Sequence, residues 1–428
     1  MLSTARSTGS STDVCVIGAG VAGLSAAHHL ISAGLRVTVL EAADRAGGRM
    51  ATDEVDGFLL DRGPQLLNTS YPELLRTPGL DDLQLRPFSP AVLVRAAGRG
   101  YRVGDPRGAL AAARAPLGSP LDKARLRAAL HRLADTPVER LLERPETTAA
   151  EALASRGFAP RAVEGYLRPL LSALLCDPWL TTSSRCADLV LRAFALGRTC
   201  LPAGGAEALP RQLAGALPEG SLRLGTRAVA ASTNAVLTEE KEELPCRAVV
   251  VATGARAAAE LLPGLRVPDF HAVTVVHHAA PTAPLREAAL VLDADRRGPV
   301  SHSLPASLVD PSRAPAGRTL VTSVLLGAAA VPDPDDDAVR AHLAELYGTS
   351  TAGWRLLAVH HDPEAVPAMP APHDLRRPVR ILQGLYVCGD HRDTSTVQGA
   401  MLSGRRAAQR LLRDVGLHPG SRTEPLAA

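Results

Sequence analysis

The chain has 428 residues, a formal net charge of +3 and 46% hydrophobic residues. This length predicts two domains with a sizeable core. The small net charge, with no stripe of basic and aromatic residues, argues against a nucleic-acid partner. None of the six cysteines stands in a CxxC pair, so the sequence predicts neither a metal site nor a redox dithiol, and such scattered cysteines are typical of a reducing compartment.

The ends of the chain carry little apolar sequence. Residues 1–12 are rich in Ser and Thr without an apolar segment, so we expect a disordered lead-in there and a second disordered tail over 417–428. No apolar run is long enough to span a bilayer. Arginine supplies almost all of the positive charge, which is typical of GC-rich bacterial genomes. We therefore expect a bacterial cytoplasmic protein, with transient membrane contact and oligomeric state left open.

A strand, turn, helix and strand open the chain. The apolar run Asp13–Ile17 precedes a glycine turn, helical spacing follows over Val21–Ala33, and Arg36–Leu40 is a second apolar run. This order and size predict a βαβ unit. From Tyr71 to Thr199 the pattern indicates a helix-rich insertion, with helices over Leu121–Leu133, Thr148–Arg156, Arg161–Leu175 and Ser183–Ala195.

Strand patterns return near Pro202. We expect strands over Ser221–Ala231, Ala235–Thr238 and Arg247–Ala252, several more between Val273 and Leu326, and one over Gly384–Cys388. Pro332–Asp337 is predicted to be a loop and Val397–Leu412 a helix.

A glycine fingerprint, Gly18-x-Gly20-x-x-Gly23, joins the first strand to the first helix, and Glu41 ends the next strand. The first glycine allows a tight turn, the second lets the backbone approach a pyrophosphate, and the third lets helix and strand pack closely. The helix N-terminus favours an anion. The glutamate can accept bonds from ribose hydroxyls and disfavours a 2′-phosphate. The fingerprint therefore predicts a dinucleotide site that includes Val21, Ala22 and Ala42; the alternative is a glycine turn of some other α/β protein.

A second motif, Arg45-Ala-Gly47-Gly48-Arg49, follows Glu41 directly and favours FAD over NAD. The glycine pair allows a tight turn beneath the nucleotide, and Arg49 can pair with its phosphates. The alternative is a surface turn that happens to contain an arginine.

Through these motifs the chain resembles the superfamily of flavin amine oxidases, protoporphyrinogen oxidases and carotenoid (phytoene) desaturases. The resemblance continues at Asp61-Arg-Gly63-Pro64-Gln65, at the Pro202–Gly205 turn, at Val229, at Val251-Ala-Thr253-Gly and at the segment GLYVCGDHRDTSTVQGAMLSGRRAA. It implies flavin contacts from Gly63, Pro64 and Gln65, an adenine contact from the Val229 backbone and a nucleotide contact from Thr253.

The C-terminal segment also has its own physical logic. Asp390 follows a predicted strand and Gly389, where its carboxylate can accept bonds from ribityl hydroxyls; the alternative is an ordinary capping aspartate. Thr396, Val397 and Gln398 begin the last helix, whose positive N-terminus can stabilise negative charge on a reduced flavin.

Catalytic residues are less clearly marked. His391, Asp393 and Gln65 are weak candidates, with Arg392 beside them, although charges in loops are usually solvated. Five histidines of the presumed substrate region are more often structural, and adjacent ones on a strand face opposite ways: His277, His278, His302, His360 and His361. Aromatic linings are sought at Trp179, Trp354 and Tyr386, with the buried core as the favoured alternative for each.

Departures from the amine oxidase pattern shape the expected reaction. Many members of the family use a lysine near the flavin, but Lys123 and Lys241, the two lysines present, lie in a helical insert and a charged run. The flavin loop 393–398 has neither an aromatic residue nor a cysteine, so we expect FAD to be bound non-covalently.

The sequence as a whole predicts an α/β protein with a Rossmann-like FAD-binding domain and a discontinuous α+β substrate domain. We expect the former over 13–70, 200–262 and 380–416, and the latter over 71–199 and 263–379. The predicted function is removal of hydride from a C–H bond of an apolar or aromatic small molecule. One alternative is an amine or amino-acid oxidase, and the other is a flavin-binding protein without turnover.

Overall fold

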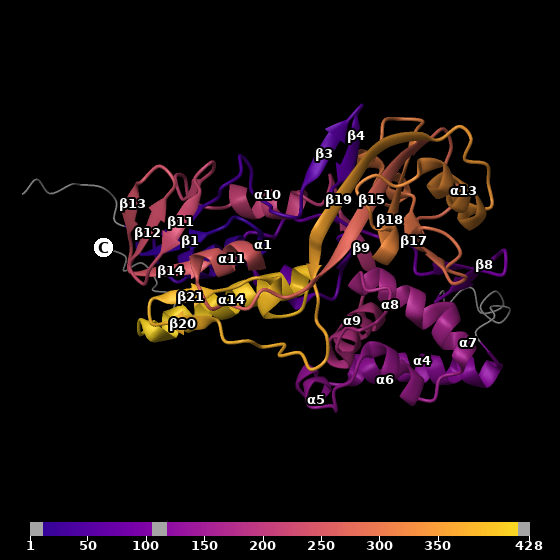
Figure 1. The fold of residues 1–428 in the computed structure, drawn as a ribbon, viewed down its shortest axis with the longest axis horizontal. Coiled ribbons are helices and arrows are strands. Elements are labelled where there is room, and N and C mark those ends of the chain that lie inside the picture. The colour runs from indigo at the N-terminus through magenta and orange to yellow at the C-terminus, as the bar shows by residue number, and fades with distance from the viewer. Residues whose placement is uncertain (1–11, 105–117, 418–428) are drawn as a thin grey trace, which may run out of the picture.

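Two large sheets organise this computed structural model, which describes residues 12–104 and 118–417. The first sheet lies in the left half of the view in Figure 1. Its six strands run in the order β10 (Leu222–Arg223), β2 (Val37–Leu40), β1 (Val14–Ile17), β14 (Ala248–Val251), β21 (Leu385–Val387) and β20 (Arg380–Leu382). All neighbours pair in parallel except the last two strands, which are antiparallel. This sheet therefore draws its strands from three separate stretches of the chain.

The central strands of this sheet are continuous apolar runs, as expected for parallel strands covered on both faces. The sequences VCVI of β1 and AVVV of β14 are fully buried. Helix α1 (Val21–Ile31) leaves the glycine turn after β1, and helix α14 (Val397–Asp414) packs closely against it. Gly404 makes this contact possible, because a Cβ there would overlap the Ala22 carbonyl oxygen.

The second sheet lies at the upper right of Figure 1 and carries the longest strands. Its order is β19 (Arg355–Pro367), β15 (Phe270–Ala280), β18 (Thr319–Leu326), β17 (Val300–Leu304), β16 (Val291–Asp293), β7 (Val92–Ala96) and β8 (Arg99–Val103). Helix α13 (Asp336–Tyr347) begins at the side-chain cap of Asp335 and ends at Gly348 in the left-handed conformation. Pro332–Asp337 is thus a loop only in part, since α13 already includes its last two residues.

The helix-rich insertion is confirmed, and each predicted helix is present. These are α4 (Pro120–Asp135), α6 (Ala149–Ser155), the run α7 (Pro160–Ala162), η2 (Val163–Leu167) and α8 (Arg168–Leu175), and α9 (Ser184–Leu196). Short α5 (Val138–Leu142) joins α4 to α6. Ser119 with Asp122 and Thr148 with Glu151 form capping boxes that fix the starts of α4 and α6.

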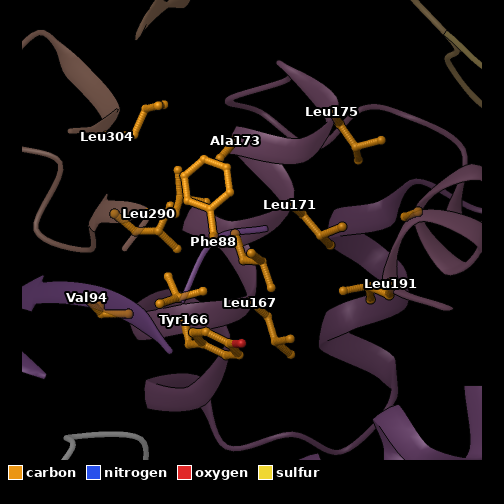
Figure 2. Packing of buried hydrophobic residues seen from close by; sticks show 14 of the residues in the cluster. Phe88, Val94, Tyr166, Leu167, Leu171, Ala173, Leu175, Leu191, Leu290 and Leu304 are labelled. Atoms are coloured by element: carbon orange, nitrogen blue, oxygen red, sulfur yellow. The ribbon is translucent and has the colours of Figure 1, made fainter. Parts of the chain in front are cut away.

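The insertion and the second sheet share one hydrophobic core. Figure 2 shows Phe88 between Leu290, which comes from the sheet side, and Leu171 of α8, with Leu167 and Leu191 beside them. Burial of such side chains stabilises a protein by roughly 1.5–3 kcal/mol each. The long helical run through η2 and α8 is therefore held firmly against the sheet.

The predicted strand over Ala235–Thr238 is confirmed as β12, which lies between β11 (Ala228–Ala231) and β13 (Glu243–Pro245) in a three-stranded meander. Helix α10 (Ala208–Gly215) follows the Pro202–Gly205 turn. Further short elements were not predicted: the hairpin β3 (Thr52–Val55) and β4 (Phe58–Asp61), the sheet of β5 (Leu67–Asn68), β9 (Thr199–Pro202) and β6 (Leu85–Pro87), strand β13, and the helices α2 (Pro72–Arg76), α11 (Ala255–Leu261) and α12 (Ala306–Val309). The expected strand over Ser221–Ala231 is wrong as a single element, because Gly225 adopts φ +62° and separates β10 from β11. The division into two domains stays a prediction.

Neither a membrane-spanning helix nor a cluster of metal-binding side chains is found among the described residues. No helix within 12–104 and 118–417 is long and apolar enough to cross a membrane. In the same ranges, no group of three or more His, Cys, Asp or Glu side chains is arranged to hold a metal ion. All six cysteines are free thiols. The predicted tails lie almost entirely outside the described residues.

Candidate cofactor and active site

A cavity of about 1220 Å³ opens between the first sheet and the second. One wall consists of the turns that follow β1, β2 and β14, together with the start of α14. Another wall comes from the end of α8 and from β15 and β19 of the second sheet. Ligand sites of α/β proteins lie at the carboxyl ends of parallel strands, and this cavity has that position.

The glycine turn after β1 forms part of the cavity wall, through Gly18 and Gly20. Gly18 adopts φ +104°, a conformation that L side chains rarely adopt. A Cβ on Gly23 would overlap the Gly18 carbonyl oxygen, so this glycine keeps the helix close to the strand. A Cβ on Gly20 would instead meet no atom within 4 Å, because Gly20 lines the cavity. The tight turn at Gly18 and the close packing at Gly23 agree with the fingerprint, and the approach of a pyrophosphate to Gly20 stays a prediction.

Glu41 lies at the end of β2 and lines the same cavity. Its Oε2 accepts a hydrogen bond from the Ala19 N–H at 2.7 Å, and its Oε1 accepts one from the Ala43 N–H at 2.9 Å. Each carboxylate oxygen has a further lone pair for a ligand hydroxyl. The glutamate is therefore both part of the turn and available to a ribose.

Arg49 and Asp390, each predicted to contact the cofactor, are paired with each other in this structure. Arg49 donates to Asp390 Oδ1 at 2.7 Å and to the Ala365 carbonyl at 2.8 Å. The Asp390 charge raises the pKa of Arg49 above its usual value. A guanidinium has five N–H donors, so Arg49 keeps donors for a phosphate. This contact joins the glycine-rich segment, the C-terminal segment and β19 around the cavity.

The N-terminus of α14 faces the cavity through Thr396 and Val397. Thr396 caps the helix by accepting a hydrogen bond from the Gly399 N–H at 3.0 Å. The first N–H groups of a helix carry partial positive charge, which stabilises an anion. The second helix N-terminus at this cavity, that of α1, follows Gly20. Both ends favour a ligand with distributed negative charge.

Most of the predicted cofactor residues meet at this cavity. Those that line it are Gly18, Gly20, Val21, Ala22, Glu41, Ala42, Gly47, Gly48, Arg49, Gly63, Pro64, Gln65, Val229, Thr253, Gly389, Asp390, Thr396 and Val397. Gly23 and Gln398 do not line it. The side chain of Gln398 turns away and accepts a hydrogen bond from the Glu73 N–H at 3.0 Å.

The candidates of the flavin loop require a correction. His391, Arg392 and Asp393 were expected to be solvated or to reach substrate, but all three are buried and none lines the cavity. Burial lowers the pKa of His391 to about 4 and raises the pKa of Asp393 to about 6. Asp393 accepts hydrogen bonds from the Thr394 N–H at 2.9 Å and from Arg406 at 3.0 Å. These contacts hold the loop in place, and of the three weak catalytic candidates only Gln65 reaches the cavity.

The aromatic candidates are divided. Trp354 and Tyr386 belong to the buried core, as the favoured alternative predicted. Trp179 packs over Gly327 at the surface and is 59% exposed. It therefore neither lines the cavity nor belongs to the buried core, which contradicts both expectations for it. The adjacent histidines His277 and His278 do face opposite ways, toward the Asp61 carbonyl and the Asp336 carboxylate respectively.

Asp61 of the D-x-G segment accepts hydrogen bonds in a network next to the cavity. It accepts hydrogen bonds from Thr52 at 2.7 Å and from the buried Arg313 at 2.6 Å. Arg313 also donates to the Pro202 carbonyl at 3.0 Å, in the turn resembling the family's P-x-G-G motif. A buried charge is stable only when it is paired and hydrogen-bonded. This network fixes the strand end from which Gly63 to Gln65 enter the cavity.

Sequence reasoning missed the wall that faces the predicted cofactor segments. It contains Leu174, Leu175 and Cys176 at the end of α8, Phe270 and Val273 of β15, and Val359, His360, His361, Asp362, Glu364, Ala365, Val366 and Pro367 of β19. These residues follow no motif. The sequence predicted a helix as far as Leu175 and strands from Val273 onward but no strand at β19, and such patterns do not mark a binding face.

The fold and cavity define a class of protein, the flavin-dependent oxidoreductases that hold a dinucleotide at a Rossmann-like sheet. Comparison with known proteins gives the family. The profile of the flavin-containing amine oxidoreductases matches residues 21–412, so the chain belongs to that family.

Individual relatives match this chain over only part of its length or at low sequence identity. The chain is 30% identical over 273 residues to a phytoene dehydrogenase of Streptomyces griseus, covering 56% of this chain and 53% of that protein. It is 46% identical over 87 residues to a putrescine oxidase of Kocuria rosea, covering 19% of this chain and 18% of that protein. The chain thus spans about half or less of these two relatives. A solved oxidoreductase from Methanosarcina mazei matches with a TM-score of 0.72 and 16% identity over 93% of this chain and 100% of that one, which shows the shared fold.

Proposed function

We propose that this protein holds FAD non-covalently and removes hydride from a C–H bond of an apolar or aromatic small molecule. The main support for this proposal is the wall opposite the cofactor segments, where four apolar side chains line the cavity: Leu174, Leu175, Phe270 and Val273. Binding pockets for apolar ligands are lined in this way. The similarity to a phytoene dehydrogenase supports a substrate of the same character.

Two features of the cavity bear on the alternative of an amine substrate. Three of the six carboxylates that line it, Asp53, Glu364 and Asp390, are ion-paired with Arg62, Arg256 and Arg49 respectively. A substrate ammonium group would have to displace an arginine at these three, whereas the other three make no ion pair among the described residues: Glu41, Glu260 and Asp362. Both lysines lie elsewhere, Lys123 in α4 and Lys241 in the turn after β12, so no lysine lines the cavity. An amine or amino-acid oxidase remains the alternative, supported by the similarity to a putrescine oxidase.

The non-covalent part of the proposal depends on the cysteines. Cys176 lines the cavity, but burial raises the pKa of its thiol to about 12. The thiolate is the reactive form, so this thiol is a poor nucleophile. Cys388 follows β21, is fully buried and likewise has its pKa raised to about 12.

The residues of the chain have distinct parts in the proposed reaction. Bound FAD would supply the hydride acceptor. The two helix N-termini would stabilise negative charge on the cofactor, and the apolar wall would exclude water and orient the C–H bond. Because orientation and electrostatics supply much of the rate enhancement, the cavity does not require a dedicated base.

Anaerobic mixing with a panel of compounds tests the proposal. Partly saturated polyenes and dihydroaromatic compounds should bleach the flavin absorbance, whereas primary amines and amino acids should not. Peroxide formation with an amine, alongside bleaching by that amine, would favour the alternative oxidase. A flavin that can be photoreduced but is not reoxidised in air, and that no compound bleaches, would favour a protein without turnover.

A further inference from the structure

A second cavity lies within the helical insertion. Its volume is about 790 Å³, and its walls come from α4, η2, α9, the segment from Thr136 to Arg144 and the turn after α6. Figure 1 shows these helices as the purple group at the lower right. The two cavities share no lining residue. The volume is within the range of small-molecule sites.

The floor of this cavity is apolar. It consists of Leu126, Ala129, Leu130, Leu133, Phe158, Leu167 and Leu191, of which Leu126, Leu133, Leu167 and Leu191 are buried members of the hydrophobic core. These side chains leave a cavity instead of closing over one another. An aliphatic chain would fill the space and add burial of apolar surface.

The rest of the lining is strongly basic. Five arginines line the cavity, and Asp135 is the only carboxylate that does so among the described residues: Arg125, Arg132, Arg140, Arg144 and Arg156. Within residues 12–104 and 118–417, neither Arg132 nor Arg140 makes an ion pair. Guanidinium groups match the geometry of carboxylates and phosphates through paired N–H donors.

Two of these arginines are held in place by one buried carboxylate. Arg144 donates to Asp188 Oδ2 at 2.8 Å, and Arg156 donates to the same oxygen at 2.9 Å. Asp188 belongs to α9 and is buried. Its single carboxylate therefore accepts hydrogen bonds from two guanidinium groups. This arrangement leaves one uncompensated positive charge and free N–H donors on rigidly placed side chains.

We propose that this cavity is a binding site for a small amphipathic anion, an aliphatic chain that carries a carboxylate or phosphate head. The apolar floor receives the chain, and the arginines receive the head. The continuous run of η2 and α8 links the site to the cofactor cavity, since Leu167 lines the first and Leu174 the second. Leu167 and Leu174 are seven positions apart along the helix, a rise of about 10 Å.

Isothermal titration of the full-length holoprotein with dodecanoate and dodecyl phosphate, below their critical micelle concentrations, tests this site. We expect saturable binding of at least one of them at one site per chain. The double variant Arg132→Gln/Arg140→Gln should weaken that binding about tenfold or more. Arg127→Gln is the matched control, because Arg127 belongs to the same helix but does not line the cavity, and its affinity should match that of the wild type.

Further probes separate the alternatives. Dodecyltrimethylammonium has the same chain with the opposite charge and should not compete. Equal binding by the double variant and the wild type would overturn the proposal and place the ligand elsewhere, for example in the cofactor cavity. Binding to phosphatidylglycerol vesicles without binding of either soluble anion would overturn it in favour of a membrane surface. Circular dichroism of each variant checks that the fold is retained.

Discussion

A side chain at Gly20 would point into the cavity, where it would meet no protein atom within 4 Å. We therefore expect Gly20→Val to fold normally and to lose FAD, because the new methyl groups would occupy the space that a pyrophosphate needs. The measurement is the flavin content of the purified variant. Gly215→Val is the matched control, since Gly215 is exposed at the end of α10, also faces open space and is remote from the cavity. Normal flavin content in Gly20→Val would mean that the fingerprint has another role.

Among individual residues, the local geometry of the glycines was easier to predict from the sequence than the environment of the charged side chains. The positive φ of Gly18, the open space at Gly20 and the close packing at Gly23 follow from the size of a hydrogen atom and from backbone geometry alone, and the spacing of the three glycines carries that information. The environment of Asp393 depends on Arg406, thirteen residues further along the chain, and on burial that no local pattern encodes. The expectation that loop charges are solvated was wrong for this reason.

The contact between α1 and α14 is the element on which the cofactor cavity most depends. A Cβ on Gly404 would overlap the backbone at Ala22, and both helices begin at the cavity. We expect Gly404→Ala to lower the free energy of unfolding by about 1–3 kcal/mol, the usual effect of overpacking, and to weaken FAD binding as the helix N-termini move apart. Thermal unfolding with and without added FAD measures both effects. A variant as stable as Gly215→Ala would contradict the close packing.

Strand β17 contains a histidine that makes stability depend on pH. His302 is fully buried, and burial lowers its pKa to about 4 from an ordinary value near 6.5. The unfolded chain therefore binds a proton at His302 below pH 6.5 that the folded protein does not bind. The free energy of unfolding should fall as the pH is lowered from 6.5 to 4, by up to about 3 kcal/mol for this group.

Denaturant unfolding at pH 7 and at pH 5 checks the effect of His302. The variant His302→Gln should lose less stability between these pH values than the wild type, whereas His131→Gln, whose side chain is 82% exposed, should behave as the wild type does. Asp393 contributes in the opposite sense, because its raised pKa favours the folded state on acidification, so the comparison of variants isolates His302. Identical pH slopes for His302→Gln and the wild type would refute the assignment.

Across the whole molecule, the cofactor half was more predictable than the substrate half. The strands β1, β2, β14 and β21 were all placed, because buried parallel strands are continuous apolar runs and their turns carry fixed glycines. In the predicted substrate domain the long strand β19 was missed, and in the predicted cofactor domain the hairpin β3–β4 was missed. Strand β19 mixes charged, apolar and proline residues, and its inward positions are decided by pairing with β15, which is distant in sequence.

The arrangement of the whole chain also predicts the path of electrons. Strand β14 ends at Val251 and is followed by Thr253-Gly254, without a second glycine fingerprint or its own acidic partner, so the sequence offers one dinucleotide site of this kind. We expect NADH and NADPH to reduce the flavin slowly or not at all. Anaerobic stopped-flow mixing with NADPH measures this directly. Bleaching within milliseconds to seconds at modest NADPH would favour a reductase over an enzyme that oxidises an organic substrate.

The presence and attachment of the cofactor can be measured on the purified protein by acid precipitation. The cavity, its two helix N-termini and the unreactive Cys176 predict a yellow protein that releases one intact FAD per chain into the supernatant. A colourless protein that takes up no FAD would contradict the identity of the cavity. Pigment that remains with the precipitate would show a covalent bond and contradict the proposed mode of binding.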